Sequence, residues 1–279
     1  MKCFKVVQQV LDATYDEIPN KSDKRDNEIS NALKSMSDQY LNNLTTSGGP
    51  DFDDPVTRFA YVYNYVPSHA HWLYELIDWS DDAKEVFTKP KIRLTCLGGG
   101  PGSDLVGILK YISQQDKQPM LFCEIIDGCI HWKQTWSDLA FNLGWKNTLH
   151  TDYSIQDVDD KKSWLTPTGI SKSDIITISF FASEIFHLGE KATKYLEHVF
   201  DKAKSGAIIL VNDNNSPRFH KWIDKIAKDS KLDTLLAEAG TRKIYDRDES
   251  TLLVGQYKEK FKRNPRLQGN LFWRVFKKP

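Results

Sequence analysis

This sequence of 279 residues has few of the residues that mark metal-binding, disulfide-bonded or membrane proteins. It has four cysteines, none in a Cys-x-x-Cys pair, and no histidines at the spacing of a zinc site, so we expect free thiols and no bound metal. No apolar run approaches the length of a membrane-spanning helix, and residues 1–12 turn polar too early for a secretory leader. These absences predict an intracellular protein, cytoplasmic or nuclear, with no membrane partner.

The sequence also lacks an excess of charge of either sign, because it has 38 Lys and Arg residues and 38 Asp and Glu residues. The strong positive charge of many nucleic-acid-binding proteins is therefore missing from the chain as a whole. The charge is nevertheless unevenly distributed. Residues 1–57 hold six basic and ten acidic residues, a balance of −4, whereas residues 258–279 hold eight basic residues and one acidic residue, a balance of +7. This basic C-terminal tail is either a solvated surface or a binding patch for an anionic partner such as RNA.

The N-terminal part of the sequence has the apolar spacing of helices. Apolar residues recur at helical intervals in residues 4–11 and again in residues 29–44. A turn-rich loop at residues 45–55 follows. The next segment is rich in aromatic residues, and we expect Pro67 to end one helix and Ser68 to open another.

From residue 91 onward, short apolar and β-branched runs alternate with helical segments. This alternation is typical of a parallel sheet covered by helices on both faces. We therefore predict an α/β, Rossmann-like, doubly wound and mostly parallel seven-stranded sheet. It lies in a domain over residues 55–279, in which residues 55–90 form a helical lid, and it follows an N-terminal helical segment over residues 1–54. The expected strands are residues 91–97, 119–127, 147–158, 174–181, 206–213, 241–257 and 270–278, the last two as an antiparallel pair.

Residues 98–102, Gly-Gly-Gly-Pro-Gly, connect the first of these strands to a helix that begins at Ser103. A phosphate-binding P-loop is excluded, because no lysine stands at the start of the helix. A dinucleotide-binding loop is disfavoured, because Ser103 stands where the third glycine belongs and Asp104 would repel a pyrophosphate. The loop instead suits a nucleoside without negative charge, since glycine lets the backbone approach the ligand closely. Asp127, at the end of the second strand, would then accept hydrogen bonds from both ribose hydroxyls.

The run "LTCLGGGPGSDLVGIL" with the later Asp127 resembles the class I S-adenosylmethionine-dependent methyltransferases. The resemblance extends from about residue 91 to the end of the chain and implies that S-adenosyl-L-methionine is the cofactor. It also implies that Asp157, or alternatively Asp152, faces the adenine amino group. Cys96 departs from the family pattern, because many members have an acid there that helps to hold the methionine ammonium group. A second resemblance, to eukaryotic rRNA uridine methyltransferase-like proteins that share the Gly-Gly-Gly-Pro-Gly-Ser-Asp loop, favours RNA as the acceptor. The residues that we expect to bind the cofactor are Gly98, Gly99, Gly100, Gly102, Asp127, Asp157 and Phe180.

The acceptor chemistry of such enzymes is usually visible at the fourth strand, here "ITISFFASEIF". Neither the [DN]-P-P-[YFW] tetrapeptide of amine methylation nor the Pro-Cys or Thr-Cys nucleophile of carbon-5 methylation occurs in it. Glu184 is either a base that orients the acceptor or a helix N-terminal acid, and His187 is either a proton shuttle or a surface residue. The two are the candidate catalytic residues. The residues that we expect on the acceptor side are Phe181, Asn212, Asp213 and Tyr65.

Three functions remain open at this stage. Methyl transfer from a sulfonium depends mainly on alignment and on exclusion of water, so the lack of a catalytic triad does not argue against it. The leading hypothesis is a methyltransferase that uses S-adenosylmethionine, with RNA slightly favoured as acceptor. The alternative is a non-catalytic sensor or scaffold that binds S-adenosylmethionine, motivated by Cys96 and the plain fourth strand. A nicotinamide-dependent oxidoreductase is third.

Overall fold

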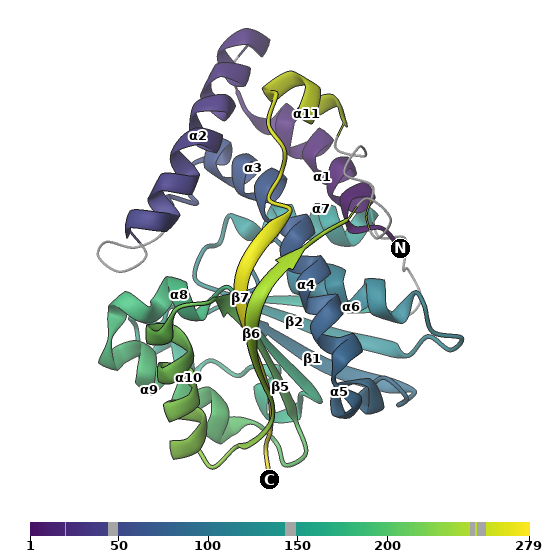
Figure 1. Cartoon of the computed structure of the whole chain (residues 1–279), viewed down its shortest axis with the longest axis vertical. Coiled ribbons are helices and arrows are strands. Elements are labelled where there is room, and N and C mark those ends of the chain that lie inside the picture. The colour runs from purple at the N-terminus through teal and green to yellow at the C-terminus, as the bar shows by residue number, and fades with distance from the viewer. Residues whose placement is uncertain (20, 44–49, 143–148, 246–248, 250–254) are drawn as a thin grey trace.

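The computed structural model describes residues 1–19, 21–43, 50–142, 149–245, 249 and 255–279. Its strands are β1 (Lys91–Leu97), β2 (Met120–Asp127), β3 (Leu149–Ile155), β4 (Ile175–Ser179), β5 (Ile208–Asn214), β6 (Asp233–Lys243) and β7 (Gln268–Lys277). Within the described residues they form one seven-stranded sheet in the order β3-β2-β1-β4-β5-β7-β6 (Figure 1). β7 runs antiparallel to both of its neighbours, β5 and β6, and the other neighbouring strands of this sheet pair in parallel. The predicted Rossmann-like, mostly parallel sheet is confirmed.

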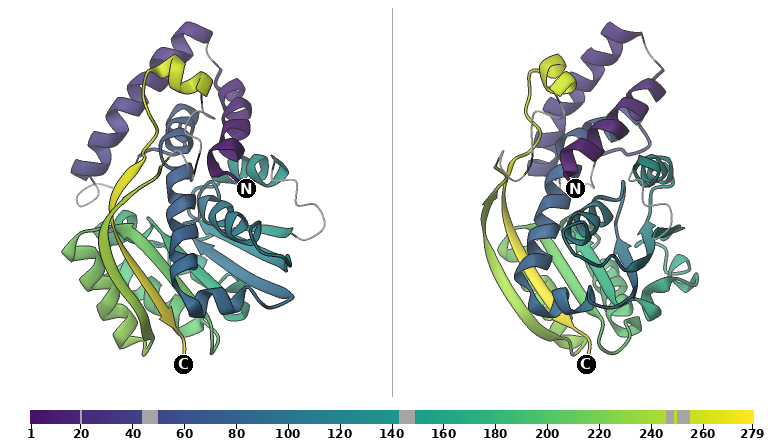
Figure 2. Two further views of the ribbon diagram at one scale, coloured as in Figure 1. Left: turned by 45° about the vertical axis from the view of Figure 1, so that its right-hand side comes forward. Right: turned by 90° about the vertical axis from the view of Figure 1, so that its right-hand side faces the viewer.

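Helices cover both faces of this sheet, because successive strand residues point to opposite sides. In β4, Ile175 belongs to the apolar core on one face, whereas Ile176 and Ile178 belong to the core on the other. Two groups of helices bury these cores, α4 with α6 and α7 on one face and α8 to α10 on the other (Figures 1 and 2). No helix among the described residues is both long and apolar enough to span a membrane. The helices are α1 (Cys3–Glu17), α2 (Ser22–Asn43), α3 (Pro55–Asn64), α4 (Val66–Trp79), α5 (Asp81–Val86), α6 (Ser103–Ile112), α7 (Trp132–Asn142), α8 (Ala182–Ile185), α9 (Glu190–Lys202), α10 (Pro217–Asp229) and α11 (Gly255–Phe261).

Two sequence-based boundaries are wrong. The helix is interrupted at Tyr65, which lies between the end of α3 and the start of α4. Pro67 therefore lies in the first turn of α4 rather than at a helix end. Proline is tolerated there because the first helical residues need no backbone N–H donor. The sixth strand is β6 and begins at Asp233, well before the expected residue 241. As the edge strand of the sheet it is exposed along most of its length, so its sequence lacks the alternation that identifies a strand.

The expected strand over residues 241–257 is therefore only partly a strand. Its first three residues end β6, and residues 255–257 belong to helix α11. Residues 246–248 and 250–254 lie outside the described residues.

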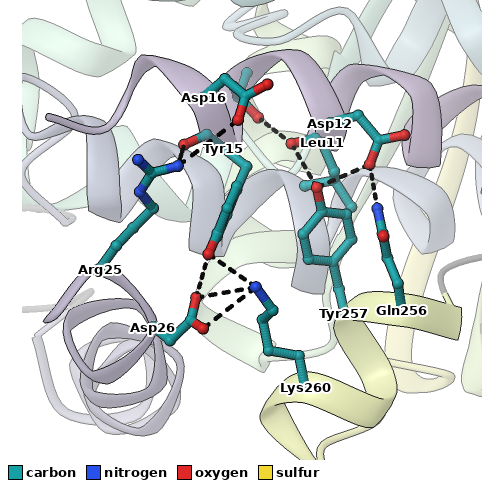
Figure 3. Close-up of polar contacts among 10 residues, drawn as sticks. Leu11, Asp12, Tyr15, Asp16, Arg25, Asp26, Gln256, Tyr257 and Lys260 are labelled. Carbon is teal, nitrogen blue, oxygen red and sulfur yellow. Dashed lines mark hydrogen bonds and ion pairs between the residues drawn. The ribbon is translucent and has the colours of Figure 1, made fainter. Parts of the chain in front are cut away.

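The acidic N-terminal part and the basic C-terminal part of the chain meet at one end of the molecule, where α1 and α2 lie beside α11 (Figure 1). Lys260 of α11 donates to the Tyr15 hydroxyl at 2.8 Å and pairs with Asp26 of α2 at 3.2 Å (Figure 3). The Tyr257 hydroxyl donates to Asp12 of α1 at 2.8 Å. Part of the uneven charge in the sequence thus stabilises the contact between the two ends of the chain.

The expected basic tail is therefore not a free tail. Residues 268–277 form the buried strand β7, where Arg274 pairs with Asp224 through two hydrogen bonds at 2.6 and 2.9 Å. The apolar residues of α1 and α2 belong to the same core as β1 and β2. The division of the chain at residue 54 and the lid over residues 55–90 remain predictions.

Candidate functional site

The glycine loop at residues 98–102 joins β1 to α6 at the carboxyl end of the sheet. Gly98, Gly100 and Gly102 have φ angles of 59°, 42° and 86°, a left-handed conformation that disfavours residues with a Cβ atom. The Gly98 amide donates to the Ile126 carbonyl at 2.8 Å, and the Gly102 amide donates to the Gly99 carbonyl at 2.7 Å. The first bond holds the loop against the end of β2, and the second closes a turn within the loop.

Asp127 lies at this loop, as the sequence predicted. Its Oδ2 accepts from the Gly100 amide at 2.9 Å, and its Oδ1 accepts from the Cys129 amide at 2.9 Å. Burial raises the pKa of this carboxyl to about 6, although the hydrogen bonds from Cys129 and Gly100 lower it. Each carboxylate oxygen can accept a further hydrogen bond, so the group can still bind a diol.

The four glycines differ in what surrounds them. A Cβ atom on Gly98 would lie 2.0 Å from the ring of Phe181, and one on Gly102 would lie 2.3 Å from the ring of Trp136. A Cβ atom on Gly99 would meet the side chain of Cys96 at 2.9 Å. Three of the four glycines are thus required by packing within the protein.

Gly100 is different, because a Cβ atom there would have only ordinary contacts. Its nearest neighbours would be Trp132 Nε1 at 3.6 Å and Asp127 Oδ2 at 3.7 Å. Gly100 is therefore the loop glycine whose Cβ direction is not blocked by packing, although it is buried between an indole N–H and a carboxylate. We call this unblocked side the open side of the loop.

Aromatic side chains from three segments gather beside Gly100. The Trp132 ring of α7 lies 4.9 Å from Phe52 and 5.4 Å from Tyr61 of α3, measured between ring centroids. Tyr61 in turn lies 5.3 Å from Tyr65, which the sequence assigned to the acceptor side. Some aromatic rings of residues 55–90, Tyr61 among them, thus pack against Trp132, which lies next to the loop.

The two phenylalanines after β4 point to different faces of the sheet. Phe180 has a φ of 56°, rare for a residue with a side chain, and its ring stacks on His69 at 3.5 Å on the α4 face. Phe181 instead packs with the core on the α9 face and lies against Gly98. The loop contact therefore comes from Phe181, which the sequence assigned to the acceptor side, rather than from Phe180.

His69 and Arg266 lie beside Phe180 and were not among the site residues expected from the sequence. His69 is 3% exposed, its Nε2 has no hydrogen-bond partner, and burial followed by the charge of Arg266 holds its pKa well below the usual value. The Arg266 guanidinium lies within 6 Å of the rings of Tyr65 and Phe180, at 5.7 and 5.9 Å. Arg266 was counted only as part of the basic tail, since nothing in the sequence links it to the fourth strand.

Asp157 and Asp152 lie in different surroundings. Asp157 follows the carboxyl end of β3 directly, where its Oδ1 accepts from the Asp159 amide at 2.8 Å. Asp152 lies in the middle of β3 and lines a pocket of about 390 Å³ with His150 and Gly169. Only Asp157 is near the edge of the sheet that carries the glycine loop, and its role toward adenine stays a prediction.

The remaining acceptor-side residues, Asn212 and Asp213, lie at the carboxyl end of β5. Asn212 is fully buried, and both its Oδ1 and Nδ2 atoms lack a hydrogen-bond partner. Asp213 accepts from the Ser183 amide at 2.8 Å and the Asn214 amide at 2.6 Å, and burial raises its pKa to about 6.

The two candidate catalytic residues lie in and directly after the short helix α8. Glu184 lies in the first turn of α8. His187 is exposed, and its Nδ1 lies 2.8 Å from the Glu184 carbonyl oxygen. Their catalytic roles stay predictions.

No family model matches the sequence, and no curated protein matches it. Among solved structures, the chain is similar to a candidate RNA methyltransferase from Pyrococcus horikoshii, at 15% identity over 77% of this chain and 87% of that chain, with a TM-score of 0.48. It is also similar to the [4+2]-cyclase SpnF, at 13% identity over 89% of this chain and 93% of that chain, with a TM-score of 0.46. A third is the precorrin-6y C5,15-methyltransferase from Geobacter metallireducens, at 10% identity over 75% and 87%, with a TM-score of 0.43. By its own strand order, with β7 inserted antiparallel between β5 and β6, the chain has the Rossmann-like fold of the class I methyltransferases.

Proposed function

We propose that this chain binds S-adenosylmethionine at the glycine loop and transfers its methyl group to an acceptor, with RNA as the favoured class. One observation carries the proposal. The Asp127 carboxylate is fixed by the Gly100 and Cys129 amides beside the open side of the loop. A carboxylate held in this way can accept hydrogen bonds from both ribose hydroxyls, while the bare backbone at Gly100 lets the nucleoside approach.

The surroundings of the loop suit a sulfonium. Trp132, Tyr61 and Phe52 present aromatic rings beside Gly100, and aromatic faces attract cations and exclude water. In the transfer step, a lone pair of the acceptor forms a bond to the methyl carbon as the carbon–sulfur bond breaks, and S-adenosylhomocysteine leaves as a neutral thioether.

The preference for RNA rests on the basic residues between α11 and β7. Lys262 and Arg263 line a pocket of about 220 Å³ together with Lys34 of α2. Arg266, three residues later, lies over the rings of Tyr65 and Phe180. A phosphate backbone bound at the first group would lie close to the Arg266 guanidinium, which can pair with a further phosphate.

The cofactor is tested by calorimetric titration with S-adenosylmethionine. Asp127→Ala should weaken binding at least about 150-fold, because two hydrogen bonds to a charged acceptor are worth about 1.5–3 kcal/mol each. Asp152→Ala is the matched control and should bind like the wild type, since that carboxylate lines a different pocket. Equal affinities of the wild type and Asp127→Ala would overturn the proposal.

The transfer is tested with cofactor labelled in its methyl group and with separated RNA, protein and metabolite fractions of a cell extract. We expect label in RNA. Label in protein or metabolites would support methyl transfer but would show that the acceptor is not RNA. Binding of the cofactor with no label in any fraction would favour the sensor or scaffold function instead.

A further inference from the structure

Asp104 is a buried carboxyl group that the proposed function has not yet used. It lies in the first turn of α6, directly after the glycine loop, and is 1% exposed. The Thr177 hydroxyl donates to its Oδ2, and the Ser103 hydroxyl lies 3.5 Å from its Oδ1. Among the described residues no Lys, Arg or His side chain forms an ion pair with it. A carboxylate buried among neutral donors alone is costly unless a cation joins it.

The fold brings this carboxyl to the end of β1. Thr177 of β4, which donates to Asp104, is the register partner of Cys96 in β1. The Asp104 carboxyl of α6 therefore lies close to the end of β1. Cys96 cannot supply a negative charge itself, because its thiol lies 3.9 Å from that of Cys123 and its pKa is raised by that neighbour and by burial. Asp104 is therefore the acid at the point where β1 enters the loop.

Two further polar side chains continue from Asp104 along the same face of the sheet. Ser179 follows Thr177 by two residues and so points to the same side of β4. It is the register partner of Asn212 in β5. Both terminal atoms of the Asn212 amide are buried without a hydrogen-bond partner. Buried amides normally have partners, so this unpaired amide beside Ser179 points to a ligand.

We propose that Asp104 binds the positively charged amino group of the cofactor's methionine part, with Ser179 and Asn212 supplying further hydrogen bonds. The inference rests on the proposed function and adds a second anchor to it. Asp127 holds the ribose at one end of the loop, and Asp104 holds the amino-acid end where α6 begins. Asn212, expected on the acceptor side from the sequence, thereby belongs to the cofactor site.

Geometry and charge agree in this assignment. Burial raises the pKa of Asp104 to about 7, in spite of hydrogen bonds from Thr177, Ser179 and Ser103 that lower it. An incoming ammonium group stabilises the ionised form and compensates the buried charge. The carboxyl is thus set up for a cationic ligand rather than for a neutral one.

The experiment compares two ligands by calorimetry, S-adenosylhomocysteine and 5′-methylthioadenosine, which has the nucleoside and sulfur but no amino-acid part. Asp104→Asn should weaken S-adenosylhomocysteine binding at least about 10-fold, the value of one charged hydrogen bond, and 5′-methylthioadenosine binding less than about 2-fold. Asn212→Ala, which leaves the carboxyl in place, should show the same selectivity with a loss of about 3-fold to 5-fold for S-adenosylhomocysteine. Asp127→Ala is the control that should weaken both ligands.

The outcomes separate this inference from the proposed function. If the wild type binds neither ligand, the proposed function fails and the inference fails with it. If the wild type binds both, and Asp104→Asn and Asn212→Ala each leave the ratio of the two affinities unchanged, only the inference is overturned. A purely structural role of Asp104 would weaken both ligands alike, so the ratio distinguishes the two roles.

Discussion

At the scale of the single residue, the loop glycines show that one motif can serve two purposes. Gly98 has its Cβ direction blocked by Phe181, so its lack of a side chain is required by the packing of the protein itself. Gly100 would have only ordinary van der Waals contacts in that direction, with Asp127 and Trp132. The first glycine is thus needed for the fold, whereas the second is available for a ligand.

This difference predicts that two alanine substitutions have different effects. Gly98→Ala should lower the free energy of unfolding by about 2–4 kcal/mol, through backbone strain and the contact with Phe181. Gly100→Ala should lower it by about 1 kcal/mol, the cost of a left-handed alanine, yet weaken cofactor binding strongly. Urea unfolding and calorimetry measure the two quantities. Stability losses of equal size would contradict the distinction.

At the scale of the elements, one buried carboxylate connects three helices. Glu249 is fully buried, and its two oxygens accept from the Cys3 and Phe4 amides at the start of α1, at 3.1 and 3.3 Å. Lys110 of α6 donates to it at 2.5 Å, and His71 of α4 lies next to the pair. The carboxylate accepts from N–H groups of the first turn of α1 that have no partner within the helix, and it stabilises the positive end of the helix.

Removing this group should therefore be costly. Glu249→Ala leaves the Lys110 charge buried without its partner and should lower the free energy of unfolding by about 3–5 kcal/mol. Asp229→Ala, which breaks the exposed Lys225–Asp229 pair of α10, is the control and should change it by less than about 0.5 kcal/mol. Similar losses for both variants in urea unfolding would show that Glu249 does not connect the helices in this way.

The elements also show what the sequence could predict. β1 coincides with its expected range, because a buried strand has a strong apolar pattern. The edge strand β6 has no such pattern and was misplaced. The partners of Asp127 were predictable in part, since the acid and the glycines lie at the ends of adjacent strands. His69 and Asp104 were not recognised as site residues, because Phe180, Thr177 and Ser179 meet them only through the packing of α4 and α6.

At the scale of the whole molecule, three buried carboxyl groups, Asp104, Asp127 and Asp213, have raised pKa values at the carboxyl ends of the strands. The folded state binds protons that the unfolded state releases, so each group contributes stability at low pH. For Asp104 this contribution is complete below the unfolded pKa of 3.8 and is lost as the pH rises through about 7. The proposed cofactor site therefore has a stability cost near neutral pH that a cationic ligand would offset.

This linkage can be measured without ligand. Asp104→Asn removes the titrating proton, and all other groups are shared with the wild type. Between pH 4 and pH 8 the wild type should lose about 2–4 kcal/mol more of its free energy of unfolding than the variant loses, because only the wild type has the Asp104 contribution. Denaturant unfolding at several pH values checks this, and a difference that does not change with pH would refute it.

The central claim is that Asp127 and the open side of the loop at Gly100 bind the nucleoside of S-adenosylmethionine. A crystal structure of the chain with S-adenosylhomocysteine tests it most directly. The account predicts that both ribose hydroxyls donate to Asp127 while the nucleoside passes beside Gly100. A ligand bound elsewhere, such as in the pocket lined by Asp152 and His150, with Asp127 contacting only the Gly100 and Cys129 amides, would contradict it.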